Sequence, residues 1–254
     1  MSTAHKLLKS AYLVLMALVA GSLLSTAVAA KPAAKSSKSA TEASTVFVRP
    51  HSPIVGPRKA PVTIVEFFDP SCEACRAVYP YVKLIMAEYP SDVRLVIRFL
   101  PLHKGSVEAI GIIEAARSQG VFLPVLEAVL EKQPLWHEGD MASAWDAAKA
   151  AGLNVDKARA SLSSPRLAAA LKQDQADGLE LGVRGTPTFF VNGKPLAQLS
   201  PRQLLDQVKT EVQASQKKEP VSGERLPNRS IQGDIKGRFA GQGRVPARAE
   251  DPAR

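Results

Sequence analysis

The chain has 254 residues, only two cysteines, and a formal net charge of +9 from 33 lysine and arginine residues against 24 acidic ones. A basic excess can serve nucleic-acid binding, but this charge is dispersed along the chain, so we expect no nucleic-acid partner. Without a second cysteine or cysteine-histidine pair, the chain also lacks the four ligands of a structural zinc site.

The first 30 residues have the composition of an export signal. Lys6 and Lys9 precede an uncharged run over residues 11–30 that ends in the small residues T-A-V-A-A. This pattern predicts a secretory signal peptide over residues 1–30, cleaved at the end of that run, and therefore a periplasmic protein. An uncleaved anchor is the alternative, since twenty uncharged residues can also span a bilayer. In either case the cysteines reach a compartment where disulfides persist.

Three further regions follow. Residues 31–45 are polar and low in complexity, which predicts a flexible linker and no dimerisation module, so we expect a monomer. Residues 46–214 are enough for one domain with a proper core. Residues 215–254 are rich in glycine, proline and arginine without a persistent period, which predicts a disordered basic tail.

The domain opens with strand signals. A short strand is possible at residues 45–48, followed by a loop rich in proline and glycine. Residues 62–68, V-T-I-V-E-F-F, are apolar on both faces and predict a buried central strand. Residues 93–100 predict a second strand, with Arg94 and Arg98 pointing outward.

A helical block separates these strands from the later ones. An all-helical insertion is predicted over about residues 104–182, with helices at 107–119, 122–132, 141–151, 155–162 and 165–181. Strand signals return at residues 188–191, and an N-G turn leads into 194–196. A capping box, S-P-R-Q, then opens a last helix over residues 201–214. The two halves of the sheet must therefore pair across the insertion.

The two cysteines form a C-x-x-C motif where the central strand runs into a helix over residues 72–89. With Cys72 at the first helical position, unpaired N–H groups and the helix dipole favour its thiolate and lower its pKa. Cys75, one turn on, faces inward as the resolving thiol. A structural disulfide is the alternative, although so short a loop constrains the unfolded chain little. Cu(I) binding by the two sulfurs is a second alternative.

Three more positions are candidates. Glu66 lies inside the buried strand, six residues before Cys72, so we expect a raised pKa and a role as proton acceptor for Cys75, unless it is a strand-end residue reaching solvent. Thr186-Pro187 precedes a strand, which favours a cis bond in a tight turn over an ordinary trans proline. His103 lies in a loop near the sulfurs, although a lone loop histidine is more often simply solvated.

Taken together, these motifs resemble the DsbA-like branch of the thioredoxin superfamily, exported thiol-disulfide oxidoreductases of bacteria. The resemblance covers about residues 53–214 and rests on V-E-F-F-D-P-S-C-E-A-C, on Pro80, on the helical insertion and on G-T-P-T-F-F-V-N-G. It implies an α/β thioredoxin fold, a central mixed sheet flanked by helices, with an inserted all-helical subdomain.

The resemblance also implies roles for five residues. Cys72 is the nucleophile, Cys75 the resolving cysteine and Glu66 the buried acid, while Thr186 and cis-Pro187 hold the substrate backbone. No cofactor or metal is implied. The partners are cysteine-containing client proteins and a membrane redox partner that resets the pair. A non-catalytic holdase or a Cu(I)-thiolate carrier on the same fold is the alternative function.

Two departures from DsbA leave the direction of electron flow open. Glu73-Ala74 stands between the cysteines where DsbA has Pro-His, and a carboxylate beside Cys72 disfavours its thiolate. We therefore expect a reduction potential below DsbA's value of about −120 mV. Thr186 before the proline resembles the isomerase relatives, but the dimerisation domain of those isomerases is missing here. The pair is thus expected to make, reduce or isomerise disulfides.

Overall fold

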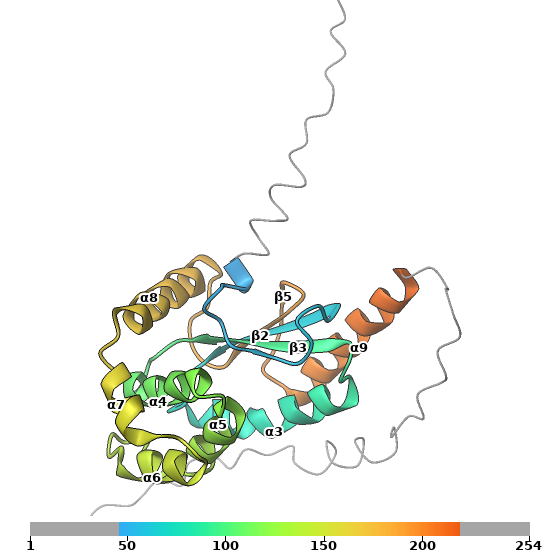
Figure 1. Ribbon diagram of the computed structural model, residues 1–254. Helices are drawn as coiled ribbons and strands as arrows, with labels where there is room; N and C mark the ends of the chain where they lie inside the picture. The colour runs from blue at the N-terminus through green and yellow to red at the C-terminus, as the bar shows by residue number, and fades with distance from the viewer. Residues whose placement is uncertain (1–45, 219–254) are drawn as a thin grey trace, which may run out of the picture. The chain divides into compact units, whose positions relative to one another are not determined.

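The structure of the protein is a computed structural model that describes residues 46–218 (Figure 1). The predicted signal peptide, the predicted linker and residues 219–254 of the predicted tail lie outside the described residues. Within residues 46–218, no helix is both long enough and apolar enough to cross a membrane.

A five-stranded mixed sheet forms the centre of the fold. Its spatial order is β1-β3-β2-β4-β5, in which β2 and β3 are parallel and all other neighbours are antiparallel. The strands are β1 (Ile54–Val55), β2 (Val62–Phe68), β3 (Val93–Phe99), β4 (Thr188–Val191) and β5 (Lys194–Pro195). The predicted pairing across the insertion is confirmed, because β2 lies between β3, which precedes the insertion, and β4, which follows it.

The first predicted strand is wrong. Val46 and Phe47 are helical, and the edge strand is β1 inside the proline- and glycine-rich loop. A strand of two residues has no alternation to detect, so only its antiparallel pairing with β3 reveals it.

The predicted helical insertion is confirmed between β3 and β4. Among residues 48–218, the helices are α3 (Glu73–Glu88), α4 (Ser106–Ser118), α5 (Phe122–Glu131), α6 (Ala142–Ala150), α7 (Val155–Ser161), α8 (Pro165–Glu180) and α9 (Pro201–Lys218). A 3₁₀ turn, η1 (Gln133–Leu135), was not predicted and joins α5 to α6. The last helix continues four residues beyond its predicted end at 214.

Each face of the sheet has its own helices. Ile64, Glu66 and Phe68 of β2 share one face, which α3 and α9 cover together. Val65 and Phe67 share the opposite face, where α8 packs. A Cβ atom at Gly178 of α8 would lie 3.3 Å from the Phe67 ring, so glycine permits this close approach.

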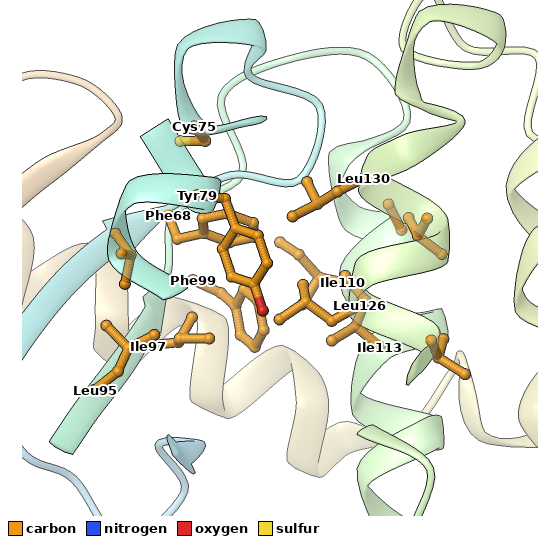
Figure 2. Close-up of a cluster of buried hydrophobic side chains, with 14 of the residues drawn as sticks. Phe68, Cys75, Tyr79, Leu95, Ile97, Phe99, Ile110, Ile113, Leu126 and Leu130 are labelled. Atoms are coloured by element: carbon orange, nitrogen blue, oxygen red, sulfur yellow. The ribbon is translucent and has the colours of Figure 1, made fainter. Parts of the chain in front are cut away.

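The insertion shares the core of the sheet domain. Figure 2 shows Phe68 of β2 and Tyr79 of α3 facing Ile110 of α4 and Leu126 of α5 in one buried cluster. The helix that carries the cysteines is therefore packed between the sheet and the insertion.

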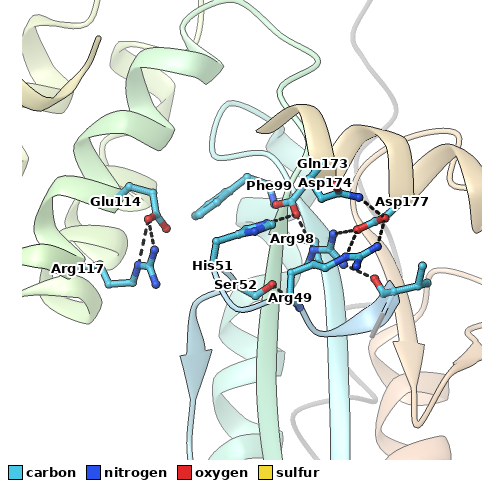
Figure 3. Close-up of polar contacts among 11 residues, drawn as sticks. Arg49, His51, Ser52, Arg98, Phe99, Glu114, Arg117, Gln173, Asp174 and Asp177 are labelled. Atoms are coloured by element: carbon cyan, nitrogen blue, oxygen red, sulfur yellow. Dashed lines mark hydrogen bonds and ion pairs between the residues drawn. The ribbon is translucent and has the colours of Figure 1, made fainter. Parts of the chain in front are cut away.

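The predicted outward orientation of Arg98 is wrong. Arg98 is fully buried and forms ion pairs with Asp174, at 2.7 Å, and with Asp177, both on α8 (Figure 3). Arg49 and His51 pair with the same two carboxylates. Helix α8 covers this end of β3, so an arginine that would face solvent on a bare sheet meets two acidic side chains instead.

Candidate active site

The cysteine motif lies where β2 ends and α3 begins. Cys72 is the N-cap of α3, with an extended backbone, rather than its first helical residue as predicted. Its side chain is almost buried and Cys75 is completely buried, and both are free thiols. The Cys72 sulfur lies 3.2 Å from the carbonyl oxygen of Thr186, to which it donates a hydrogen bond when it is protonated.

Several donors converge on the Cys72 sulfur. A hydrogen bond from the Cys75 thiol lowers the pKa of Cys72 most, and the neighbouring Thr186 side chain and the backbone N–H groups of Cys75 and Ala74 lower it further. Burial opposes them, and the resulting pKa is about 5. At neutral pH this sulfur is a thiolate, the species that attacks a disulfide.

Cys75 has the opposite character. Burial raises its pKa most, the hydrogen bond that it donates to Cys72 raises it further, and the charge of Glu66 adds to both. The pair therefore consists of one thiolate near the surface and one thiol that holds its proton beneath it. Such an asymmetry suits an attacking sulfur and a resolving sulfur.

Glu66 is buried in the middle of the sheet, as predicted. It pairs with Ile97 of β3 and Phe189 of β4, so it is not a strand-end residue that reaches solvent. Burial, and then the charge of Cys72, raise its pKa well above the ordinary range. Neither carboxyl oxygen has a hydrogen-bond partner within the described residues. The side chain lies on the sheet face that α3 covers, on the same side as Cys75.

The bond between Thr186 and Pro187 is cis, as the motif predicts. It directly precedes β4, the neighbour of β2 in the sheet. The register of these strands brings Thr186 next to the start of α3, although the insertion separates the two segments in sequence.

Asp69 is a buried residue of the site that the sequence analysis missed. Its carboxylate accepts hydrogen bonds from the Ser106 hydroxyl, at 2.8 Å, and from the backbone N–H groups of Ser71 and Leu102. His103 Nδ1 lies 2.7 Å from the same carboxylate, so His103 is not merely solvated. Asp69 thus ties the cysteine loop to the loop that enters the insertion. The sequence feature that could have identified Asp69 is its position between the end of β2 and the first cysteine, in F-F-D-P-S-C.

Glu73 is less influential than its position in the motif suggests. Its side chain is 74% exposed, and its carboxylate lies 3.5 Å from His137 Nε2 of the insertion. Solvent screens a charge with this exposure, so its repulsion of the Cys72 thiolate is weak.

The site offers few groups to a metal ion. Within residues 46–218, no three histidine, cysteine, aspartate or glutamate side chains are grouped to hold one. The two sulfurs are the soft ligands that are present.

The fold and the paired thiols resemble those of thioredoxin-like oxidoreductases. A family model described as Thioredoxin matches residues 49–210, and the chain belongs to this family. Its fold, with the helical insertion between β3 and β4, is similar to that of DsbA proteins.

Solved structures agree with this assignment. A thioredoxin-like oxidoreductase from Silicibacter pomeroyi is 27% identical, with a TM-score of 0.60 over 69% of this chain and 98% of that one. Wolbachia pipientis α-DsbA1 has a TM-score of 0.63 at 16% identity, over 69% of this chain and 98% of that one. At this identity the second likeness concerns the fold alone.

Sequence relatives include parts of membrane proteins. The Na(+)/H(+) antiporter NhaA of Herminiimonas arsenicoxydans is 34% identical over 143 residues, which are 56% of this chain and 22% of the antiporter. NhaA 3 of Salinispora tropica is 38% identical over 143 residues, 55% of this chain and 21% of that protein. The chain therefore spans about a fifth of the length of the curated relatives it matches.

Proposed function

We propose that the protein is an exported thiol-disulfide oxidoreductase that acts on cell-envelope proteins through Cys72 and Cys75. The observation that carries this proposal is the opposite shift of the two thiol pKa values. The pKa of Cys72 is lowered to about 5, whereas that of Cys75 is raised by burial. A purely structural disulfide does not require a stabilised thiolate on one of its sulfurs.

In the oxidising direction, a client thiolate attacks Cys72 Sγ of the disulfide, and Cys75 leaves and takes up a proton. Glu66, whose carboxyl pKa is raised by burial, is the proposed donor of that proton. A second client thiolate then attacks the client sulfur of the mixed disulfide and releases Cys72 as a thiolate. The client gains a disulfide, and the pair Cys72-Cys75 takes up two electrons.

In the reducing direction, the same steps run backwards. The Cys72 thiolate attacks a client disulfide, Glu66 accepts the proton of Cys75, and Cys75 displaces the client from Cys72. Both directions need only the residues of this site and a redox partner that resets the pair. We propose a membrane protein as that partner.

Thr186 and Pro187 are the proposed client-binding residues. The carbonyl group of Thr186 lies against the Cys72 sulfur, so a client whose sulfur bonds to Cys72 must lie along this segment. A carbonyl oxygen at this position accepts a hydrogen bond from an extended client backbone.

The pKa of Cys72 also bears on the direction of electron flow. A value of about 5 lies between the values of about 3.5 for DsbA and about 7 for thioredoxin. A less stabilised thiolate makes the disulfide a milder oxidant, so we place the potential between about −120 and −270 mV, the values of those two proteins.

The proposed location is the periplasm, beside a membrane. The likeness to about a fifth of several antiporters supports this location, because it shows that related sequences form part of membrane proteins. The export signal proposed over residues 1–30 agrees with it.

Turnover by single-cysteine variants tests the proposal. We expect the reduction of insulin disulfides by dithiothreitol to be accelerated by the unaltered protein and not by Cys72→Ser. Cys75→Ala should instead accumulate a mixed disulfide between Cys72 and its client, visible on a non-reducing gel. If Cys72→Ser still protects an unfolded client from aggregation while the unaltered protein shows no turnover, the protein is a holdase and the proposal is wrong.

A further inference from the structure

The turn η1 of the helical insertion reaches the cysteine loop through one side chain. Gln133 is fully buried, and its Nε2 donates to the carbonyl oxygens of Pro70, at 2.6 Å, and Cys72, at 2.9 Å. Its Oε1 accepts a hydrogen bond from Arg76 Nε, at 3.0 Å. One amide therefore contacts the chain before, at and after the first cysteine.

These contacts fix the orientation of the amide. Arg76 Nε is a donor, so the oxygen of Gln133 must face it, and the NH₂ group must face the two carbonyls. Every hydrogen-bonding position on this buried group except one oxygen lone pair is thus used. A glutamine placed only to fill space would not need three partners in one loop.

The Cys72 carbonyl is the important partner. It accepts a hydrogen bond from Gln133 and another from the backbone N–H of Arg76, at 3.1 Å, which closes the first turn of α3. The N–H groups that follow, of Ala74 and Cys75, are the ones that face the sulfur. Holding this carbonyl therefore holds the first turn of α3 relative to the Cys72 side chain.

We propose that Gln133 is a positioning residue of the redox pair, which keeps the Cys72 sulfur over the first N–H groups of α3 although it belongs to the insertion. This inference rests on the proposed function. The insertion would then do more than cover the core. Its turn between α5 and α6 would also determine how strongly the Cys72 thiolate is stabilised.

The turn itself is held in place. His137 Nδ1 lies 3.0 Å from the carbonyl oxygen of Gln133, and the indole N–H of Trp136 donates to the carbonyl of Val129 on α5, at 2.8 Å. The turn is therefore closed on itself and attached to α5, so it can hold the loop that it contacts.

The test compares three variants with a matched control. Gln133→Met keeps the length and removes every polar atom, and Gln133→Glu keeps the shape but cannot donate to the two carbonyls. Gln133→Asn is the milder change, since its amide is one methylene too short to reach the two carbonyls in the same way. The control is Gln119→Met: Gln119 lies in the same insertion and also bonds backbone atoms, those of Asn154, away from the cysteines.

We would measure the thiolate titration of Cys72 by absorbance and the equilibrium constant with glutathione. The loss of one net hydrogen bond should change the acid dissociation constant of Cys72 by about threefold to tenfold, so that less thiolate is present at a given pH. The equilibrium constant with glutathione should change by the same factor, so that the disulfide becomes a weaker oxidant. Gln119→Met should lower only the stability. Urea unfolding identifies which variants are folded.

A folded Gln133→Met or Gln133→Glu protein that titrates like the unaltered protein would overturn the inference. If both fail to fold, an unchanged titration in folded Gln133→Asn overturns it equally. A different result would overturn the proposed function itself: the unaltered protein would show no thiol-disulfide exchange with glutathione.

Discussion

The Cys72 sulfur lies 3.2 Å from the carbonyl oxygen of Thr186, although 114 positions separate the two residues. The whole helical insertion lies between them in sequence, and the pairing of β2 with β4 brings them together. The nucleophile and the proposed client-binding segment are therefore joined by the sheet.

The first prediction concerns the hydrogen bonds to Cys72. We expect thiolate absorbance to rise with a midpoint near pH 5 in the unaltered reduced protein. In Cys75→Ala the largest stabilising donor is lost, so the midpoint should move to higher pH. Thr186→Val should move it in the same direction by less, because Thr186 contributes less than Cys75. A midpoint in Cys75→Ala at or below that of the unaltered protein would contradict this account.

The second prediction concerns Glu66. An unpaired buried polar group costs about 1–3 kcal/mol, so Glu66→Leu should raise the free energy of unfolding by about that amount. The same variant should slow the release of clients from Cys72, since Cys75 loses its proton acceptor. Stopped-flow reduction and urea unfolding measure the two effects. Faster exchange in Glu66→Leu would exclude the proposed proton transfer.

The pH dependence of Glu66 has a definite sign. Its folded pKa is raised above the unfolded value of about 4.3, so protonation favours folding. This contribution is complete below pH 4.3 or so and is lost as the pH rises through the folded pKa. The stability gained in Glu66→Leu should therefore be smallest near pH 4, where only the unpaired neutral carboxyl is removed, and should grow as the pH rises toward neutrality.

The third prediction concerns the ion pairs behind the sheet. Arg98→Met leaves Asp174 and Asp177 buried without their shared partner, which should cost about 3–5 kcal/mol of unfolding free energy. Arg94→Met is the control on the same strand. Arg94 is half-buried and bonds the Thr63 hydroxyl, so its loss should cost about 1 kcal/mol. Equal losses in the two variants would mean that the buried network contributes little.

The fourth prediction is the acid limit of that network. Burial alone would raise the pKa of Asp177, but hydrogen bonds from Arg49 and Arg98 lower it to about 2. The folded pKa lies below the unfolded value of about 3.9, so this stabilisation is present above pH 4 or so and is lost as the pH falls through 2. Asp177→Asn should remove that part of the acid dependence. An unchanged slope below pH 4 would show that Asp177 does not titrate with folding.

Local pattern was sufficient for much of this fold. The apolar run of β2 and the cysteine spacing at its end gave the centre of the site, and capping residues and glycines gave helix boundaries correct to within a few residues. The cis bond before Pro187 and the burial of Glu66 also followed from single positions in a strand pattern.

What the sequence could not predict depends on contacts between distant segments. In the alternating pattern of β3, Arg98 occupies a position that would face solvent. It becomes a buried member of an ion pair only because α8 packs over it. Gln133 has no pattern of its own, because its partners lie about 60 residues earlier in the chain. The exposure of Glu73 and its contact with His137 were likewise hidden, and they weaken the repulsion that the C-E-A-C motif suggests.

The equilibrium reduction potential of Cys72-Cys75, measured against glutathione in the protein without residues 1–30, tests the central claim most directly. The account predicts a reversible two-electron couple between about −120 and −270 mV, because the thiolate is stabilised less than in DsbA and more than in thioredoxin. A potential at or above about −120 mV would contradict the inference that the Cys72 thiolate is stabilised less than the thiolate of DsbA. A pair that does not exchange with glutathione would contradict the redox function itself.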